Sequence, residues 1–327
     1  MIVKGVGTDV SKDHLDVCVY TEAKEFWRRF PNSSKGFAAC LKWLKSFAET
    51  IEFVYEPTGR YAELFVEFMH KKGCIPLQAN PFEVSRYAEG LDMRTTTDRK
   101  AAYALARYAF ERLDKCKKWQ PCGDHKYELR DIQLLLRSLG KRCTTVTNQL
   151  KCGLRSDFVR KDLNAELDEL ERRFDDALKR AEIIIRNDEV LCEDFDRLLE
   201  IPGIAEQTAT LLLTLVDFRA FRSGRAVACF LGLTPRKHES GTSVKDKEHI
   251  SKCGSKYVRS QLWMPVRTTR RNDPVAHALA ARLLAKEKHD WLVQVAVIRR
   301  LVTVAWAVVA KGVAYDPNYR HPLAKPI

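Results

Sequence analysis

The chain has 327 residues, 45% hydrophobic and 30% charged, a composition that is typical of an ordinary globular protein and excludes a disordered one. Its formal charge of +13 favours a polyanionic partner such as nucleic acid, although a solvated basic face has the same composition. The excess is concentrated late in the chain, where residues 244–327 hold sixteen Lys or Arg and six Asp or Glu.

The first 115 residues carry strand and helix patterns. Short apolar runs separated by polar breaks predict antiparallel strands over 2–10, 14–21 and 25–30. Apolar spacing then predicts, in order, a helix over 34–48, a strand ending at Glu56, a helix over 60–72, a strand over 74–80 and a helix over 99–113. Strands first, followed by strand and helix in alternation, predict an α/β domain with a mixed sheet over residues 1–115.

Three acidic residues lie at the edge of this predicted sheet. Asp9 is late in the first strand, Glu56 ends a later strand, and Asp98 opens a helix, where an aspartate is also natural as a cap. Any one of them alone is more often structural, but together they have the arrangement by which RNase H-like folds gather carboxylates on a divalent metal. Two Mg²⁺ ions about 4 Å apart require several anionic oxygens. We therefore predict Asp9, Glu56 and Asp98 as metal ligands and Mg²⁺ as the cofactor.

Residues 116–190 predict a long antiparallel helical hairpin. Apolar residues recur at steps of three and four in two seams, the first of Leu129, Ile132, Leu136, Leu139, Cys143, Val146 and Leu150, the second of Leu163, Leu167, Leu170, Phe174, Ala177, Ala181 and Ile184. Gly153 and the polar residues around it allow the chain to reverse between them. We expect the hairpin to pair with another subunit, although the same pattern occurs in the core of an ordinary helical domain.

Residues 191–327 predict a mainly helical domain. The stretch "LLEIPGIAEQTATLLLTLV" has the pattern of a helix-hairpin-helix, whose turn can hold a phosphate, or of a plain helical corner. A basic, glycine-punctuated segment over 230–263 is typical of a loop that approaches DNA. The apolar run at 301–310 is too short to span a membrane and predicts a core helix. Ten cysteines without paired spacing indicate free thiols in a reducing cytoplasm.

Motifs along nearly the whole chain resemble the transposases of the insertion-sequence 110 family, including its 1111 subgroup. They are "GTDVSKDHLDV", "YEPTGRYAELF", "NPFEVSRYAEG", "TTTDRKAAYALARYA", "IPGI" and "GLTPRKHESGTSVKDKEHISKCG". The resemblance implies a RuvC-like domain with an Asp-Glu-Asp-Asp quartet, a coiled-coil hairpin and a carboxyl-terminal transposase domain with a nucleophilic serine. It also implies a recombinase guided by a structured noncoding bridge RNA, whose loops pair with donor and target DNA, working as a tetramer, a dimer of dimers.

The quartet maps to Asp9, Glu56, Asp98 and position 101, where this chain has Ala101 in place of the family's aspartate. An acid three residues after Asp98 would share its helix face, so the replacement leaves a gap in the metal shell. We therefore expect the chain as written to be inactive. Because every surrounding motif is intact, we favour an engineered replacement over a natural degenerate copy.

The family's nucleophile maps to Ser240 in "HESGTS", with Ser243 and Ser251 as rivals on spacing alone. A serine hydroxyl attacks phosphate poorly unless it loses its proton and the phosphate charge is neutralised. Basic residues around Ser240, and arginines interleaved with tyrosines in the first domain, predict nucleic-acid contacts, although a solvated surface has the same pattern. The predicted contacts are Arg60, Arg94, Arg99, Lys237, Lys245, Lys252, Lys256 and Arg259.

Two other functions fit the same residues. A RuvC-type junction nuclease would use water as the nucleophile and leave no covalent adduct, and a catalytically dead protein would bind RNA and DNA without cutting. In each case we expect no membrane association and a bacterial cytoplasmic, nucleoid-associated location. The expected domain boundaries are 1–115 for the RuvC-like domain, 116–190 for the hairpin and 191–327 for the serine transposase domain.

Overall fold

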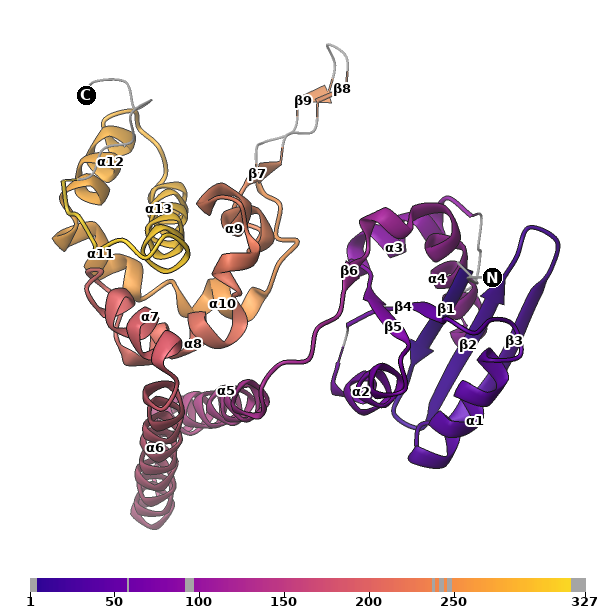
Figure 1. The fold of residues 1–327 in the computed structure, drawn as a ribbon. Helices are drawn as coiled ribbons and strands as arrows, with labels where there is room; N and C mark the ends of the chain where they lie inside the picture. Colours follow the sequence, from indigo (N-terminus) through magenta and orange to yellow (C-terminus); the bar gives the residue numbers. More distant parts are fainter. Residues whose placement is uncertain are drawn as a thin grey trace. The chain divides into compact units, whose positions relative to one another are not determined.

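A computed structural model describes residues 5–57, 59–91, 97–236 and 249–318, with the backbone alone at 239–240 and 244–245 (Figure 1). The chain divides into two compact units, Met1–Cys122 and Gly123–Ile327. The helical hairpin and the carboxyl-terminal helices therefore belong to one unit. The finer division into domains at residues 115 and 190 stays a prediction.

The first unit is built on a mixed sheet of six strands in the order β3-β2-β1-β4-β5-β6 (Figure 1). β1 and β2 are antiparallel, as are β2 and β3, whereas β1, β4 and β5 run parallel. The bounds are β1 Gly5–Val10, β2 His14–Tyr20, β3 Glu25–Pro31, β4 Glu52–Tyr55, β5 Ile75–Gln78 and β6 Lys117–Lys118. This strand order confirms the predicted RNase H-like, mixed α/β fold.

Helices cover both faces of this sheet. They are α1 Ser34–Leu44, α2 Glu63–Lys71, α3 Pro81–Glu89 and α4 Asp98–Arg112, with single 3₁₀ turns at Arg60–Ala62 and Leu113–Lys115. α1 and α2 pack on one face, through residues such as Phe37 and Phe65, and α4 packs on the other through Leu105. The sequence prediction missed α3 and β6, and it extended α1 to residue 48, four residues beyond its observed end.

Gly7 allows α4 to lie directly against β1. A Cβ atom at this position would come within 2.2 Å of the Ala106 backbone nitrogen and 2.5 Å of the Ala102 carbonyl oxygen. Real side-chain atoms do not approach backbone this closely, so only glycine fits. Because side chains alternate along a strand, Asp9 points to the same face as Gly7, the face that α4 covers.

The second unit is almost entirely helical. Its helices are α5 Asp124–Lys151, α6 Asp157–Arg186, α7 Glu189–Leu199, α8 Glu206–Leu215, α9 Gly224–Phe230, α10 Lys256–Gln261, α11 Pro265–Asn272, α12 Pro274–Leu284 and α13 Asp290–Ala310, with a 3₁₀ turn at Phe218–Ala220. Two-residue strands pair as β7 Pro235–Arg236 with β10 His249–Ile250, and as β8 Glu239–Ser240 with β9 Val244–Lys245.

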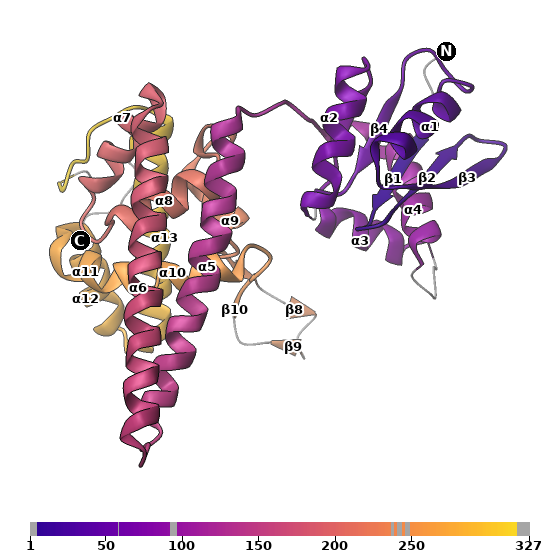
Figure 2. The same ribbon diagram turned by 90° about the horizontal axis from the view of Figure 1, so that it is seen from below.

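The predicted helical hairpin is confirmed by α5 and α6, which run antiparallel side by side (Figure 2). Gly153 has a φ of +72° where the chain reverses between them. The outer part of the seam buries Leu139, Val146 and Leu170. The inner part, with Leu129 and Ala181 among its buried residues, instead joins the core of the carboxyl-terminal helices. One end of the hairpin is thus anchored in the domain, and the other is held by its own seam.

The I-P-G-I turn between α7 and α8 packs against α11. Gly203 has a φ of +98°, and a Cβ atom there would meet the Pro265 carbonyl oxygen at 2.5 Å. The Thr269 hydroxyl donates a hydrogen bond of 2.7 Å to the Pro202 carbonyl oxygen. These contacts support the helical-corner interpretation of the turn.

α13 is the core helix of the second unit. By length and composition it could cross a bilayer, and it is the single such helix in the described part of the chain. Half of its apolar window is buried inside the unit, however, with Val297, Leu301 and Val302 at 1% exposure or less. The prediction of a core helix at 301–310 is therefore confirmed.

Candidate metal and catalytic site

One cross-strand row on the α4 face of the sheet contains Asp9, Asp16 and Arg29. The register pairs Asp9 of β1 with Asp16 of β2, and Asp16 with Arg29 of β3. Residues directly opposite each other in antiparallel strands have neighbouring side chains. The sheet therefore places two carboxylates and a guanidinium side by side where α4 begins.

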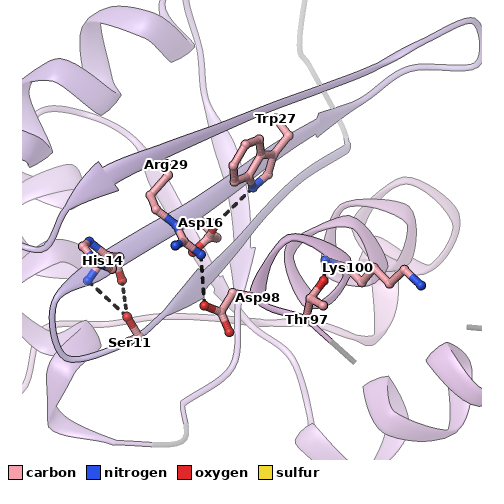
Figure 3. Close-up of polar contacts among 8 residues, drawn as sticks. All are labelled: Ser11, His14, Asp16, Trp27, Arg29, Thr97, Asp98 and Lys100. Carbon is pink, nitrogen blue, oxygen red and sulfur yellow. Dashed lines mark hydrogen bonds and ion pairs between the residues drawn. The ribbon is translucent and has the colours of Figure 1, made fainter. Parts of the chain in front are cut away.

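Asp98 approaches this row from the start of α4. The helix is capped by Thr97, whose hydroxyl accepts a hydrogen bond of 3.3 Å from the Lys100 backbone nitrogen. Asp98 is thus not the cap, and its side chain, 56% exposed, points toward Arg29 (Figure 3). The first turn of a helix favours a negative charge, which also suits a carboxylate at this position.

Arg29 connects Asp98 to the buried Asp16 (Figure 3). One terminal nitrogen of its guanidinium lies 3.0 Å from Asp16 and 3.0 Å from Asp98, and its Nε lies 3.1 Å from Asp16. The Asp16 carboxylate is 1% exposed and also accepts a 3.0 Å hydrogen bond from the Trp27 indole. A buried carboxylate needs such partners. Asp16 therefore holds Arg29 in place, and Arg29 in turn contacts Asp98.

Asp9 and Glu56 lie at the same edge of the sheet. β1 pairs in parallel with β4 through Thr8 and Tyr55, so the residues that follow, Asp9 and Glu56, continue neighbouring strands. Burial and the charges of Asp98 and Asp16 raise the pKa of Asp9 to about 6. Burial and the charge of Asp9 raise the pKa of Glu56. Asp9 therefore lies close enough to both Asp98 and Glu56 for their negative charges to interact.

This carboxylate set fits a divalent metal in its chemistry. Hard cations bind several carboxylate oxygens, and a cation would relieve the repulsion that raises the two pKa values. In the described part of the chain, however, no three His, Cys, Asp or Glu side chains gather closely enough to hold an ion. Asp98 is paired with Arg29 instead. The chemistry of these side chains thus suits a divalent metal. In this conformation, however, they are not gathered around one point where an ion could bind.

A hollow of about 390 Å³ opens beside the two strand ends. Its lining comes from the segments that directly follow Asp9 and Glu56, and includes Val10, Ser11, Lys12, Gly59, Tyr61 and Ala62. Lys12 supplies a positive charge at its wall. The hollow therefore lies beside the chain segments that follow β1 and β4, and no carboxylate is among the described residues that line it.

Ala101 lies one helical turn after Asp98, on α4, and is half-buried. Its backbone nitrogen donates to the Thr97 carbonyl oxygen at 2.8 Å, so the helix is regular at this position. Residues three apart on a helix share a face. A carboxylate at position 101 would thus lie beside Asp98, and the helix is regular with alanine there.

The predicted serine region is described only in part. The backbone of Ser240 belongs to β8 and pairs with Val244 of β9, but its side chain lies outside the described residues, as do Lys237 and the side chain of Lys245. Lys252 is exposed and has a φ of +56°, next to the tight contact between Gly232 and Cys253.

The remaining predicted nucleic-acid contacts differ in their surroundings. Lys256 is exposed at the start of α10, Arg60 is exposed at the start of its 3₁₀ turn, and Arg94 lies outside the described residues. Arg99 lies 3.1 Å from Glu25 and 5.3 Å from the centre of the Trp27 ring.

Arg259 ties two loops together. One of its guanidinium nitrogens donates to the carbonyl oxygens of Leu231, at 3.0 Å, and Gly254, at 2.7 Å. These bonds give it a structural role at the base of the loop that carries Ser240. Its predicted contact with nucleic acid stays a prediction.

Sequence reasoning missed Asp16, Trp27 and Arg29. The available signal was an acidic residue in the middle of "HLDVCVY", a strand whose other residues from 15 to 19 are apolar. Pairing that strand with its neighbours would have brought Asp16 opposite both Asp9 and Arg29, because register determines which residues meet across strands.

Family models match both units. One, for the DEDD transposases of IS110 elements, matches residues 6–159, and another, described as "Transposase IS116/IS110/IS902 family", matches residues 195–281. The chain is similar to the pilin gene-inverting proteins of Moraxella lacunata and Moraxella bovis, each 28% identical over 325 residues, 95% of this chain and 97% of the relative. It is 35% identical to a putative transposase of Sinorhizobium fredii over 127 residues, 36% of this chain and 32% of that protein.

Among solved structures, a chain of Thermus thermophilus RuvC in complex with a Holliday junction substrate matches at 16% identity. The match covers 35% of this chain and 98% of that one, with a TM-score of 0.27, which is too low to support an argument. The fold assignment rests instead on the strand order and on the family models. Because two models of one family match separate regions and two relatives align along almost its whole length, the chain belongs to the IS110 family of transposases and site-specific recombinases.

Proposed function

We propose that the protein is the DNA recombinase of an insertion sequence, joining strands through a covalent phosphoserine at Ser240 with the help of a divalent metal held by Asp9, Glu56 and Asp98. One observation carries the metal part: burial and neighbouring carboxylate charge raise the pKa of Asp9 to about 6, at the point where two parallel strands end. Clustered carboxylates with perturbed pKa values are typical of functional sites.

In the proposed reaction, the Ser240 oxygen attacks a phosphodiester. A bond forms between that oxygen and phosphorus, the bond from phosphorus to the 3′ oxygen breaks, and the serine proton ends on the released 3′ hydroxyl. When bound, Mg²⁺ would supply charge neutralisation for the phosphate and for the attacking and leaving oxygens. Ser240 and the carboxylates belong to different units, so folding or assembly has to join them.

The chain as written is proposed to be inactive because Ala101 removes the fourth carboxylate. Asp9, Glu56 and Asp98 then have to hold the metal without a ligand from the next turn of α4. α4 is a regular helix around Ala101, and Asp98 is the acidic residue in its first turn. This supports the loss of one ligand without any other change in the helix.

The partners we propose are donor and target DNA, a structured guide RNA and further copies of the chain in a tetramer. The charge of +13 supports a nucleic-acid partner. Exposed apolar residues on the hairpin, such as Leu134 on α5 and Ile183 on α6, support pairing between copies. Sequencing the RNA that co-purifies with the protein tests the guide.

The Ala101→Asp variant, incubated with the co-purified RNA, donor and target DNA and Mg²⁺, tests the proposed chemistry. We expect a covalent protein-DNA adduct that disappears in Ala101→Asp/Ser240→Ala and persists in the matched control Ala101→Asp/Ser243→Ala. An adduct that survives Ser240→Ala refutes the nucleophile. Metal-dependent cleavage without any adduct would favour the RuvC-type nuclease, and binding without cleavage would favour the catalytically dead protein.

A further inference from the structure

An exposed tryptophan lies at the start of α13. The Trp291 side chain is 63% exposed, and one face of its ring stacks on Trp263, with centroids 4.4 Å apart and planes 28° apart. Trp263 is partly buried in the segment between α10 and α11. The pair therefore forms a rigid platform, because Trp263 fixes the orientation of Trp291 from below.

Two more exposed apolar side chains neighbour the tryptophan pair in sequence. Met264, next to Trp263, is 63% exposed, and Leu292, next to Trp291, is 47% exposed. Large apolar residues that gather on the surface of a soluble protein often mark an interaction site. The hydrophobic core of the unit lies elsewhere, around Val293 and Val297 of the same helix, so fold stability does not require Trp291 to face solvent.

α11, which begins directly after Trp263 and Met264, carries positive charge. Arg270 lies 2.6 Å from Asp290, which ties the end of α11 to the start of α13 and neutralises that pair. Arg267 and Arg271, one turn apart and both exposed, form no ion pair with any described residue. Lys286 and Lys288 are exposed in the loop that leads to Trp291. We name Trp263, Met264, Arg267, Arg271, Trp291 and Leu292 the Trp291 surface.

We propose that the Trp291 surface binds an unpaired segment of single-stranded DNA, with a base stacked near Trp291 and phosphates beside Arg267 and Arg271. Aromatic platforms flanked by cations are how proteins hold single strands, because every base has a π-face and every nucleotide a phosphate. In duplex DNA the bases stack on one another, so their faces are not available to the indole.

The choice of DNA as the ligand follows from the proposed function, on which this inference rests. Strand exchange passes through unpaired DNA, and a recombinase gains by holding a released strand until it is rejoined. A protein partner would also cover apolar side chains, and aromatic residues, Met and Arg are enriched at protein interfaces as well. What favours a polyanion is charge: Arg267 and Arg271 are exposed and have no acidic partner among the described residues, in a chain of formal charge +13.

Titration of a fluorescently labelled oligo-dT, followed by anisotropy with the full chain, measures this binding without requiring recombination. We expect Trp291→Ala to weaken binding by about fivefold or more, the loss of one base stack, and Trp291→Phe to retain most of it. Arg267→Gln should weaken binding and lower the salt slope by about 0.7, the value for one phosphate contact on a single strand.

Matched controls lie on the hairpin of the same unit. Phe158, on α6, is 80% exposed, and Arg173, on the same helix, is an exposed arginine without an ion pair among the described residues. Phe158→Ala and Arg173→Gln should leave oligo-dT binding unchanged. Equal losses in these controls would mean that binding is only diffuse attraction to a basic protein, and the inference fails.

Three further results separate this inference from the proposed function. If oligo-dT binding is unchanged in both Trp291→Ala and Arg267→Gln, the Trp291 surface is not a binding site for single-stranded DNA, whatever the protein does catalytically. Tighter binding of oligo-U or of duplex DNA than of oligo-dT would assign the surface to a different ligand, and the inference would also be wrong. Oligo-dT binding that depends on Trp291, together with no phosphoserine adduct in the Ala101→Asp variant, would support the surface and contradict the proposed reaction.

Discussion

The guanidinium of Arg29 lies 3.0 Å from the carboxylate of Asp98, a predicted metal ligand, and the same nitrogen lies 3.0 Å from the buried Asp16 (Figure 3). Arg29 comes from β3 and Asp98 from α4, 69 residues apart. Carboxylates that ligate metals are commonly oriented by such outer partners, whose loss weakens metal binding. The contact therefore connects the edge of the sheet to the geometry of the candidate site.

Replacing Arg29 with methionine should destabilise the first unit by several degrees in thermal unfolding. The variant leaves Asp16, 1% exposed, with the Trp27 indole as its remaining side-chain partner, and an unpaired buried carboxylate is costly. Arg29→Met/Asp16→Asn should lose less than the sum of the single changes, because the two residues are coupled. The matched control is Arg28→Met on the same strand, which should unfold close to wild type. Equal effects of the two methionine variants would contradict a stabilising role of the Arg29–Asp16 contact, and additive effects in the double variant would contradict the coupling.

A methyl group on Gly7 should displace α4 from the sheet. The added Cβ in Gly7→Ala would lie 2.2 Å from the Ala106 backbone nitrogen, which cannot move without moving the helix. Overpacking of this kind costs about 1–3 kcal/mol or more in the free energy of unfolding. Urea unfolding measures the loss. In the control Gly90→Ala the new Cβ meets its nearest neighbour at 3.4 Å, so the loss should be small, and a comparable loss there would argue against the close approach.

Asp9 should make folding less favourable as the pH rises. Burial and neighbouring carboxylates raise its pKa from 3.8 to about 6, so between these values the folded protein holds a proton that the unfolded chain releases. Stability from this residue is thus present at low pH and lost as the pH rises toward 6. Relative to wild type, Asp9→Asn should gain melting temperature at pH 7.5 and little at pH 4.5. A gain that is equal at both pH values, or equal in the control Asp13→Asn, would contradict this.

Restoring the fourth carboxylate should strengthen metal binding. In Ala101→Asp, a second acid one turn after Asp98 adds an anionic ligand, so Mg²⁺ or Mn²⁺ should raise the melting temperature more than it does in the chain as written. At a metal concentration a hundredfold above Kd, binding adds about 2.7 kcal/mol to stability. The control is Ala101→Asn, which has similar shape without charge. If all three chains respond alike, position 101 is not a ligand position, and strand exchange should not return either.

Introducing charged residues at exposed apolar positions of the hairpin should weaken assembly. Leu134 on α5 and Ile183 on α6 are 49% and 51% exposed, and neither belongs to the buried seam. Leu134→Glu/Ile183→Glu should shift the oligomer toward smaller species in analytical ultracentrifugation, because charge is costly in an apolar interface. Asn148→Glu, on an exposed face of α5, serves as the control. An unchanged sedimentation profile of the double variant would place the interface elsewhere.

Local sequence patterns determined much of the architecture. Short apolar runs and polar breaks located β1, β2 and β3, and the apolar seams located α5 and α6, since these patterns depend on residues that are near in sequence. The positions of Asp9, Glu56 and Asp98 at element ends were also visible in the sequence, as was the departure at Ala101. The short α3 and β6 were missed because neither has a strong pattern of its own.

What the tertiary structure decided is how the charges are paired. Register across β1, β2 and β3 brought Asp16 between Asp9 and Arg29, and the close packing of α4 on Gly7 brought Asp98 to Arg29. The Trp263–Trp291 stack likewise joins residues 28 apart in sequence. None of these pairs follows from local propensity, because long-range contacts depend on how whole elements dock.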